Sequence, residues 1–237
     1  MFFFDPLYLL IFGVTLVISL AAQMYIKSAY GKWSKVPNSH NLTGLQVGQE
    51  LLRDTDLGAT YQLSKGTGVQ FQGIAGNLTD HYDPRTHTVG LSQAAATQPS
   101  VPSMAIVAHE LGHAQQYANK SALISARSFL LPAVRVSPMI SYGLLMVGLI
   151  FNMVGAIYIG ILFFGITVLF SILTLPVEFD ARRRGLKLLA DAGLMTSPQD
   201  EQGARTVLRA AAATYVAATI TAILQLLYYL ALANRRR

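Results

Sequence analysis

The chain has 237 residues and a formal net charge of +6, and 52% of its residues are hydrophobic while only 13% are charged. Soluble domains carry about 25% charged residues, so much of this chain is expected to face lipid rather than water. The absence of cysteine excludes disulfides and thiolate metal ligands. The basic residues lie beside apolar stretches, which indicates anchoring at a membrane surface rather than binding of nucleic acid.

Three apolar stretches predict about four transmembrane helices. Residues 6–26 and 210–233 each have the length of one span. The first is expected to be a retained anchor helix rather than a cleaved signal peptide, because no positive charge precedes it. Residues 136–175 contain no charged side chain, and a span needs about 20 residues, so this stretch predicts two helices joined by a turn at 152–155.

The larger polar segment, residues 27–135, is expected to form a soluble portion between the first two spans. Thr43 and Gln46 form a capping box that predicts a helix to about Leu52. A longer helix is expected to start at Pro102 or Ser103, and a further one over 121–131 is expected to end at Pro132.

Three short strands are predicted ahead of the long helix of this segment. Residues 59–63, 68–71 and 86–91 have the composition and turn signals typical of strands. The last of them lacks proline and directly precedes the long helix, so we expect it to be an open edge that pairs with an extended peptide.

A second polar segment, residues 176–209, follows the paired spans. It is expected to be helical to about Ala190, with Gly193 as its stop, before the last span begins.

The long helix of the soluble portion carries the pattern His-Glu-x-x-His at residues 109–113. His109 and His113 are four residues apart and therefore share a helix face, where two imidazoles can bind zinc. Glu110 lies about 100° around the helix, where it can act on a metal-bound water. A chain of this composition would contain the pattern by chance roughly twice in a thousand cases, so a metal site is favoured over a helix with two incidental histidines.

A catalytic zinc site needs a third protein ligand. Gln116 and Asn119 stand where a metzincin would have glycine and histidine, which excludes that class. Glu178 comes directly after an apolar span, where a lone carboxylate is costly unless it is paired or coordinated, so it is the favoured ligand. The alternatives are an interfacial ion pair of Glu178 with Arg182, or ligation by Asp180, His81 or His87.

Four separated motifs, AHELGHAQQ, LTDHYDPRTHTVGLS, FDPLYLLI and EFDARRRGL, together resemble the YugP-type family of membrane zinc metallopeptidases over nearly the whole chain. That family looks related to the larger gluzincin membrane proteases, whose late motif runs Glu-Phe/Tyr-x-Ala-Asp. The resemblance implies His109, His113 and Glu178 as zinc ligands and Glu110 as the catalytic base.

The resemblance also implies a fold class. We expect an α+β membrane protein with about four transmembrane helices and a gluzincin-like zinc-protease portion of helices and a small sheet. The chain departs from the late motif at Arg182, where the distant relatives have aspartate. The carboxylate that orients a ligand histidine must then come from elsewhere, and Asp180 and Asp191 are the candidates.

The expected ligands constrain the topology. His109 and His113 precede the stretch 136–175 and Glu178 follows it, so this stretch must cross the membrane an even number of times. The two polar segments then share a side and hold fifteen of the eighteen lysines and arginines, which favours the cytoplasm. We therefore expect a multi-pass plasma-membrane protein whose active site faces the cytoplasm.

The expected function is a zinc-dependent endopeptidase that hydrolyses peptide bonds of membrane or misfolded proteins. Its expected surroundings are the lipid bilayer and partner membrane proteins, with no nucleic acid. An intramembrane protease is disfavoured, because residues 101–114 are too short to span and polar residues follow them. The alternative outside enzymes is a non-catalytic membrane scaffold with a structural zinc, which would have no use for Glu110.

Overall fold

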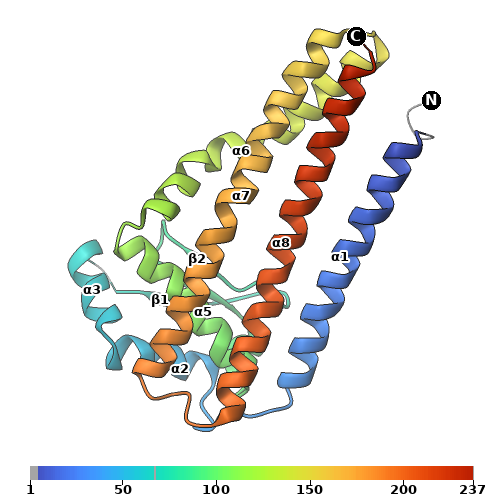
Figure 1. The fold of residues 1–237 in the computed structure, drawn as a ribbon. Coiled ribbons are helices and arrows are strands. Elements are labelled where there is room, and N and C mark those ends of the chain that lie inside the picture. Colours follow the sequence, from blue (N-terminus) through green and yellow to red (C-terminus); the bar gives the residue numbers. More distant parts are fainter. Residues whose placement is uncertain (1–4, 67, 237) are drawn as a thin grey trace. The chain divides into compact units, whose positions relative to one another are not determined.

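The computed structural model describes residues 5–66 and 68–236 and contains eight helices and three strands among them. The elements divide into two compact units. The helical unit comprises Met1–Met24, Ser125–Pro176 and Ala213–Arg237, and the sheet-containing unit comprises Tyr25–Ile124 and Val177–Ala212. The structure therefore confirms an α+β chain in which a small sheet accompanies predominant helix (Figure 1).

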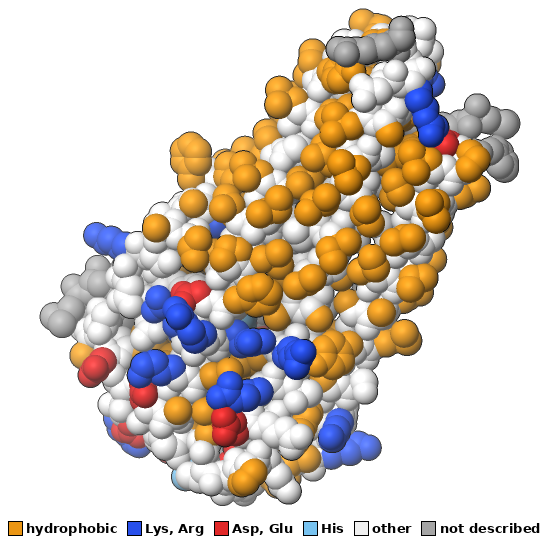
Figure 2. Space-filling model, viewed as in Figure 1, with side chains coloured by type: hydrophobic (Ala, Val, Ile, Leu, Met, Phe, Trp, Pro, Cys, Tyr) orange, Lys and Arg blue, Asp and Glu red, His pale blue; other side chains and the backbone are white. Residues whose placement is uncertain are grey.

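Four helices are long and apolar enough to cross a bilayer, as predicted: α1 (Pro6–Trp33), α6 (Ala122–Ile150), α7 (Val154–Asp191) and α8 (Pro198–Asn234). Hydrophobic side chains cover the face of the helical unit that is visible in Figure 2. The turn between α6 and α7 contains Asn152 with a φ of 54°, in agreement with the predicted turn.

Helices α6 and α7 pack closely within the helical unit. The hydroxyl of Ser141 donates a hydrogen bond to the carbonyl of Gly160 at 2.8 Å. A Cβ on Gly160 would lie only 3.0 Å from the side chain of Leu145, so glycine permits this approach.

The predicted end of a helix at Pro132 is wrong. Helix α6 continues through both Pro132 and Pro138 to Ile150. Proline removes one backbone hydrogen bond, but helices of membrane proteins tolerate it because neighbouring groups satisfy the freed carbonyl.

The sheet has the strand order β1-β3-β2, with β1 (Gln70–Ile74) parallel and β2 (His81–Asp83) antiparallel to β3 (Thr88–Ser92). The prediction of an open edge at 86–91 is therefore wrong, because β3 is the central strand and pairs on both sides. Its Val89 and Leu91 are buried, which matches the inner face of a sheet rather than a substrate-binding edge.

The predicted strand at 59–63 is also wrong. These residues belong to α3 (Asp56–Lys65), whose first turn is capped by the side chain of Thr55 and whose last turn ends at Gly66 with a φ of 72°. These start and stop signals outweigh the short alternating pattern. Helix α2 (Gly44–Asp54) begins with the predicted capping box of Thr43 and Gln46, which is confirmed.

Helix α5 (Val101–Ala118) forms the core of the sheet-containing unit. Most of its side chains are buried against α2, α3, the sheet and the short helix α4 (Gln93–Thr97). Helix α5 starts at Val101, and Ser100 caps its first turn. The pattern His-Glu-x-x-His therefore lies on a largely buried helix.

Candidate metal centre

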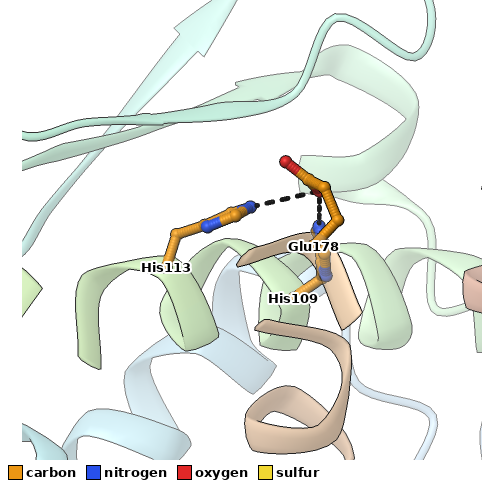
Figure 3. Close-up of side chains that lie close together, drawn as sticks. All are labelled: His109, His113 and Glu178. Carbon is orange, nitrogen blue, oxygen red and sulfur yellow. Dashed lines mark ion pairs between the residues drawn. The ribbon is translucent and has the colours of Figure 1, made fainter. Parts of the chain in front are cut away.

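His109, His113 and Glu178 come together in the sheet-containing unit (Figure 3). The two histidines project from α5 and the glutamate from α7, and their candidate ligand atoms lie within 4.8 Å of one another. Glu178 Oε2 is 3.4 Å from His109 Nε2 and 3.5 Å from His113 Nε2. Among the described residues these three form the one group of histidines and carboxylates close enough to share an ion.

These distances fit a tetrahedral zinc ion. Two donor atoms that each lie about 2.1 Å from the same tetrahedral ion are about 3.4 Å apart. Glu178 Oε2 is buried and has no hydrogen-bond partner among the described residues. An ion between the three side chains would satisfy this oxygen, so the donor set fits the metal that the sequence predicts.

Small residues bring α5 and α7 close enough for the three side chains to meet. A Cβ on Gly112 would lie 2.4 Å from the carbonyl oxygen of Ala181, and a Cβ on Gly185 would lie 2.6 Å from that of Ala108. Both separations are shorter than any real contact, so only glycine fits at these two positions.

Gln116 connects His113 to α7. Its Oε1 lies 3.0 Å from His113 Nδ1, and its Nε2 donates to the carbonyl of Val177 at 2.8 Å and to Asp180 Oδ2 at 2.9 Å. The side chain of Gln116 is fully buried, and all of its polar atoms are engaged. Because Oε1 can only accept, His113 carries its proton on Nδ1 and presents Nε2 to Glu178.

Asp180 therefore acts on His113 through an amide rather than by direct contact. Its carboxylate also accepts hydrogen bonds from Arg183 and Arg184, and Arg184 in turn donates to Gln115. Asp191, the other candidate, pairs with Lys187 at an exposed position instead. Sequence reasoning missed Gln116, although its position three residues after His113 places it on the same helix face.

The electrostatics of the centre favour an ionised carboxylate. Burial disfavours the charged form of Glu178, but the adjacent imidazoles of His109 and His113 outweigh burial and hold the pKa of this carboxyl well below its usual range. Burial likewise opposes the charged form of His113, while Glu178 and Glu110 together raise the pKa of its imidazole. A cation at this place is therefore stabilised.

Glu110 is 7% exposed and lies next to His109 on α5. Its carboxylate accepts no hydrogen bond from any described residue. A carboxylate in such a sheltered place is available to a water molecule or a substrate, since no neighbouring side chain competes for it.

The other sequence candidates lie elsewhere. His81 contacts the carbonyl of Thr79, and His87 contacts the hydroxyl of Tyr82. Arg182 forms no ion pair with any described residue, so Glu178 is not its partner.

Comparison with known proteins points the same way as the geometry. Residues 8–234 match a family model described as "Putative neutral zinc metallopeptidase". The chain is 32% identical over 212 residues to the "Putative membrane protease YugP" of Bacillus subtilis (strain 168), and the match covers 90% of each chain. No solved structure matches the chain.

Proposed function

Because the chain belongs to the family described as putative neutral zinc metallopeptidases, we propose that it is a membrane-embedded zinc-dependent endopeptidase with its metal held by His109, His113 and Glu178. One observation carries this proposal: a carboxylate oxygen of α7 lies 3.4 and 3.5 Å from two imidazole nitrogens of α5, the separations of donors in a tetrahedral site, beside a sheltered carboxylate that no other side chain engages. Two histidines from one helix with a glutamate from a later helix correspond to the gluzincin arrangement.

His109, His113 and Glu178 would hold the zinc ion, which would supply Lewis acidity and lower the pKa of a water molecule. Glu110 accepts the proton of the attacking water at its carboxylate and later returns that proton to the leaving amine. Its position one residue after His109 on α5 keeps it beside the site without using it as a ligand.

Gln116 and Asp180 hold His113 in position for this chemistry. The amide oxygen of Gln116 fixes the proton of His113 on Nδ1, so that Nε2 is free to bind metal. Asp180 and the carbonyl of Val177 fix the orientation of the amide, because both accept from its nitrogen. The amide of Gln116 thus takes the role of the aspartate in the late motif of the distant relatives, a position that Arg182 occupies in this chain.

The substrates that fit this site are polypeptides of membrane or misfolded proteins, and the site faces the cytoplasm of a plasma-membrane protein. The basic residues of the sheet-containing unit support that orientation, since positively charged segments are retained on the cytoplasmic side. An intact Glu110 supports an enzyme over a scaffold with a structural zinc, because a structural site has no role for this carboxylate.

The test separates metal binding from chemistry. Glu110→Gln is expected to keep bound zinc at the wild-type level and to abolish cleavage of an unfolded protein such as casein, because the ligands remain and the base is lost. His113→Ala is expected to lose both zinc and cleavage. Zinc-loaded wild-type protein that cleaves no polypeptide would favour the scaffold, and a Glu110→Gln variant that still cleaves would remove Glu110 from its role.

A further inference from the structure

A basic pocket lies in the sheet-containing unit between the end of α7 and the start of α8. Its volume is about 600 Å³. Its lining contains four cationic side chains and one carboxylate: Arg182, Arg183, Lys187, Arg205 and Glu201. Phe179 and Leu186 add apolar surface. In Figure 2, lysine and arginine side chains gather over these parts of α7 and α8.

The positive charge of the pocket is only partly compensated. Lys187, Arg183 and Arg205 each pair with a carboxylate three or four residues away on their own helix. The pairs of Lys187 and Arg205 are exposed, and exposed pairs are weak and exchange readily with other anions. Arg182 has no ion pair with any described residue, so at least one guanidinium is free to bind an anion.

The pocket is distinct from the candidate metal centre. Glu178, Ala181 and Gly185 face α5, and Ala181 and Gly185 touch its backbone. Arg182, Arg183 and Lys187 line the pocket, and none of them pairs with His109, His113 or Glu178. A ligand in the pocket would therefore not compete for the metal ligands.

The cationic residues follow or precede apolar stretches by short distances along their helices. Arg182 lies seven positions after Leu175, the last residue of the predicted pair of spans, which is about 10 Å along a helix axis. Side chains of a helix lean toward its N-terminus, so the guanidinium of Arg182 leans back toward the apolar stretch. On α8, Arg205 lies five positions before the apolar residues that begin at Ala210.

This spacing matches the depth of phospholipid headgroups. The polar layer adds about 5–8 Å to each side of a hydrocarbon core of about 30 Å, and arginine extends several ångströms further along its own side chain. Phe179 is 44% exposed and lies between the apolar stretch and Arg182, the place at which aromatic residues contact the interface.

We infer that the pocket binds the phosphate of an anionic phospholipid headgroup, with Arg182 and Arg183 as its principal contacts. Phosphate oxygens match the paired donors of a guanidinium. The same chemistry would accept a free phosphate, but the spacing of the pocket from two apolar helix segments favours the lipid. The inference depends on the pocket and not on peptidase activity.

The experiment uses the full-length protein in detergent and measures bound phosphatidylglycerol and phosphatidylcholine by native mass spectrometry. The wild type is expected to retain phosphatidylglycerol in preference to phosphatidylcholine. The double variant Arg182→Gln with Arg183→Gln is expected to weaken phosphatidylglycerol binding at least tenfold. The control Arg53→Gln with Arg85→Gln removes the same charge from exposed positions outside the pocket and is expected to bind as the wild type does.

Three outcomes would overturn the inference. One is that the Arg53 and Arg85 control variant loses as much bound phosphatidylglycerol as the pocket variant, which would show that binding depends on net charge alone. Another is unchanged binding by the Arg182 and Arg183 double variant. The third is displacement of the lipid by millimolar inorganic phosphate, which would identify a free anion as the ligand. Thermal unfolding, measured in each variant, reports on the fold, and a single Lys187→Gln variant with a smaller loss of lipid binding covers the case in which the double variant does not fold.

Discussion

Gln116 Nε2 donates a hydrogen bond to Asp180 Oδ2 at 2.9 Å, and this bond joins α5 to α7 beside the candidate metal centre. The oxygen of the same amide accepts a hydrogen bond from His113 Nδ1. A histidine that binds metal normally donates a hydrogen bond from its other ring nitrogen to a carboxylate or a backbone carbonyl. Here the neutral amide of Gln116 accepts the hydrogen bond. The carboxylate of Asp180 contacts the amide and not the histidine.

Replacement of Gln116 tests this arrangement. Gln116→Ala is expected to weaken zinc binding about 10- to 100-fold, because His113 loses the group that sets its tautomer and orientation. Asp180→Asn keeps an acceptor for the amide and is expected to have a smaller effect. Zinc affinity measured by competition with a fluorescent chelator gives both values.

Gln115→Ala is the matched control for Gln116→Ala. Gln115 is the neighbouring residue on α5, but its side chain contacts Arg184 rather than a candidate ligand. Its replacement is expected to leave zinc affinity unchanged. A folded Gln116→Ala protein with wild-type zinc affinity would show that Gln116 does not position His113.

Gly112 and Gly185 test the close approach of α5 and α7. Gly112→Ala and Gly185→Ala are each expected to destabilise the protein by about 1–3 kcal/mol, because the new Cβ must displace a backbone carbonyl. Both are also expected to reduce bound zinc, since the two helices carry the candidate ligands. Thermal unfolding followed by circular dichroism and zinc content measured on the same samples check both effects.

Gly165→Ala is the control for these glycine variants. Gly165 lies in α7, and a Cβ there would meet nothing within 4 Å. Its replacement should leave both the unfolding temperature and the zinc content unchanged. A Gly112→Ala protein that behaves like Gly165→Ala would show that the helices separate without cost.

Local signals in the sequence predicted part of the structure. The capping box of Thr43 and Gln46 and the turn near Asn152 depend on neighbouring residues only, and both are confirmed. The placement of His109 and His113 on one helix face follows from their spacing, and Glu178 was selected by the cost of a lone carboxylate after an apolar stretch.

The features that sequence reasoning missed depend on tertiary structure. The central place of β3 is determined by pairing with β1 and β2, which no short pattern reveals. Helix α6 passes through Pro132, which helices of membrane proteins tolerate where neighbouring groups satisfy the freed carbonyl. The bond between Gln116 and Asp180 depends on the rotation of α7 against α5, which Gly112 and Gly185 permit.

Asp200 is expected to stabilise the start of α8 in a manner that depends on pH. Its buried carboxylate accepts hydrogen bonds from the backbone nitrogens of Ser39 at 3.1 Å and Ser197 at 3.2 Å, and from the hydroxyl of Ser39. Burial opposes ionisation, but these hydrogen bonds outweigh it and lower the pKa of the carboxyl from its usual 3.8. The stabilisation is therefore complete above the usual pKa and is lost as the pH falls through the lower pKa of the folded state.

Asp200→Asn is expected to lower the free energy of unfolding by about 1–3 kcal/mol at pH 7, because an amide donor then faces the hydrogen-bond donors of Ser39 or Ser197. The difference in unfolding temperature from the wild type should shrink when the pH falls below the usual pKa of 3.8. Asp191→Asn, at an exposed ion pair with Lys187, should change little at either pH. If the unfolding temperature of Asp200→Asn stays equally far below that of the wild type in acid, the carboxyl of Asp200 is not the ionised group that stabilises the fold.

The last prediction concerns the side of the membrane that the candidate metal centre faces. The chain contains no cysteine, so single cysteines report their own position without interference. Arg85→Cys and Gln199→Cys, at exposed positions of the sheet-containing unit, should be shielded from an impermeant thiol reagent in intact cells and labelled after the cells are opened. Met153→Cys lies at the exposed turn between α6 and α7 and should be labelled in intact cells, because a hairpin of two spans places its turn on the opposite side. The reverse pattern would place the centre outside the cytoplasm, and labelling of all three in intact cells would contradict a two-span hairpin.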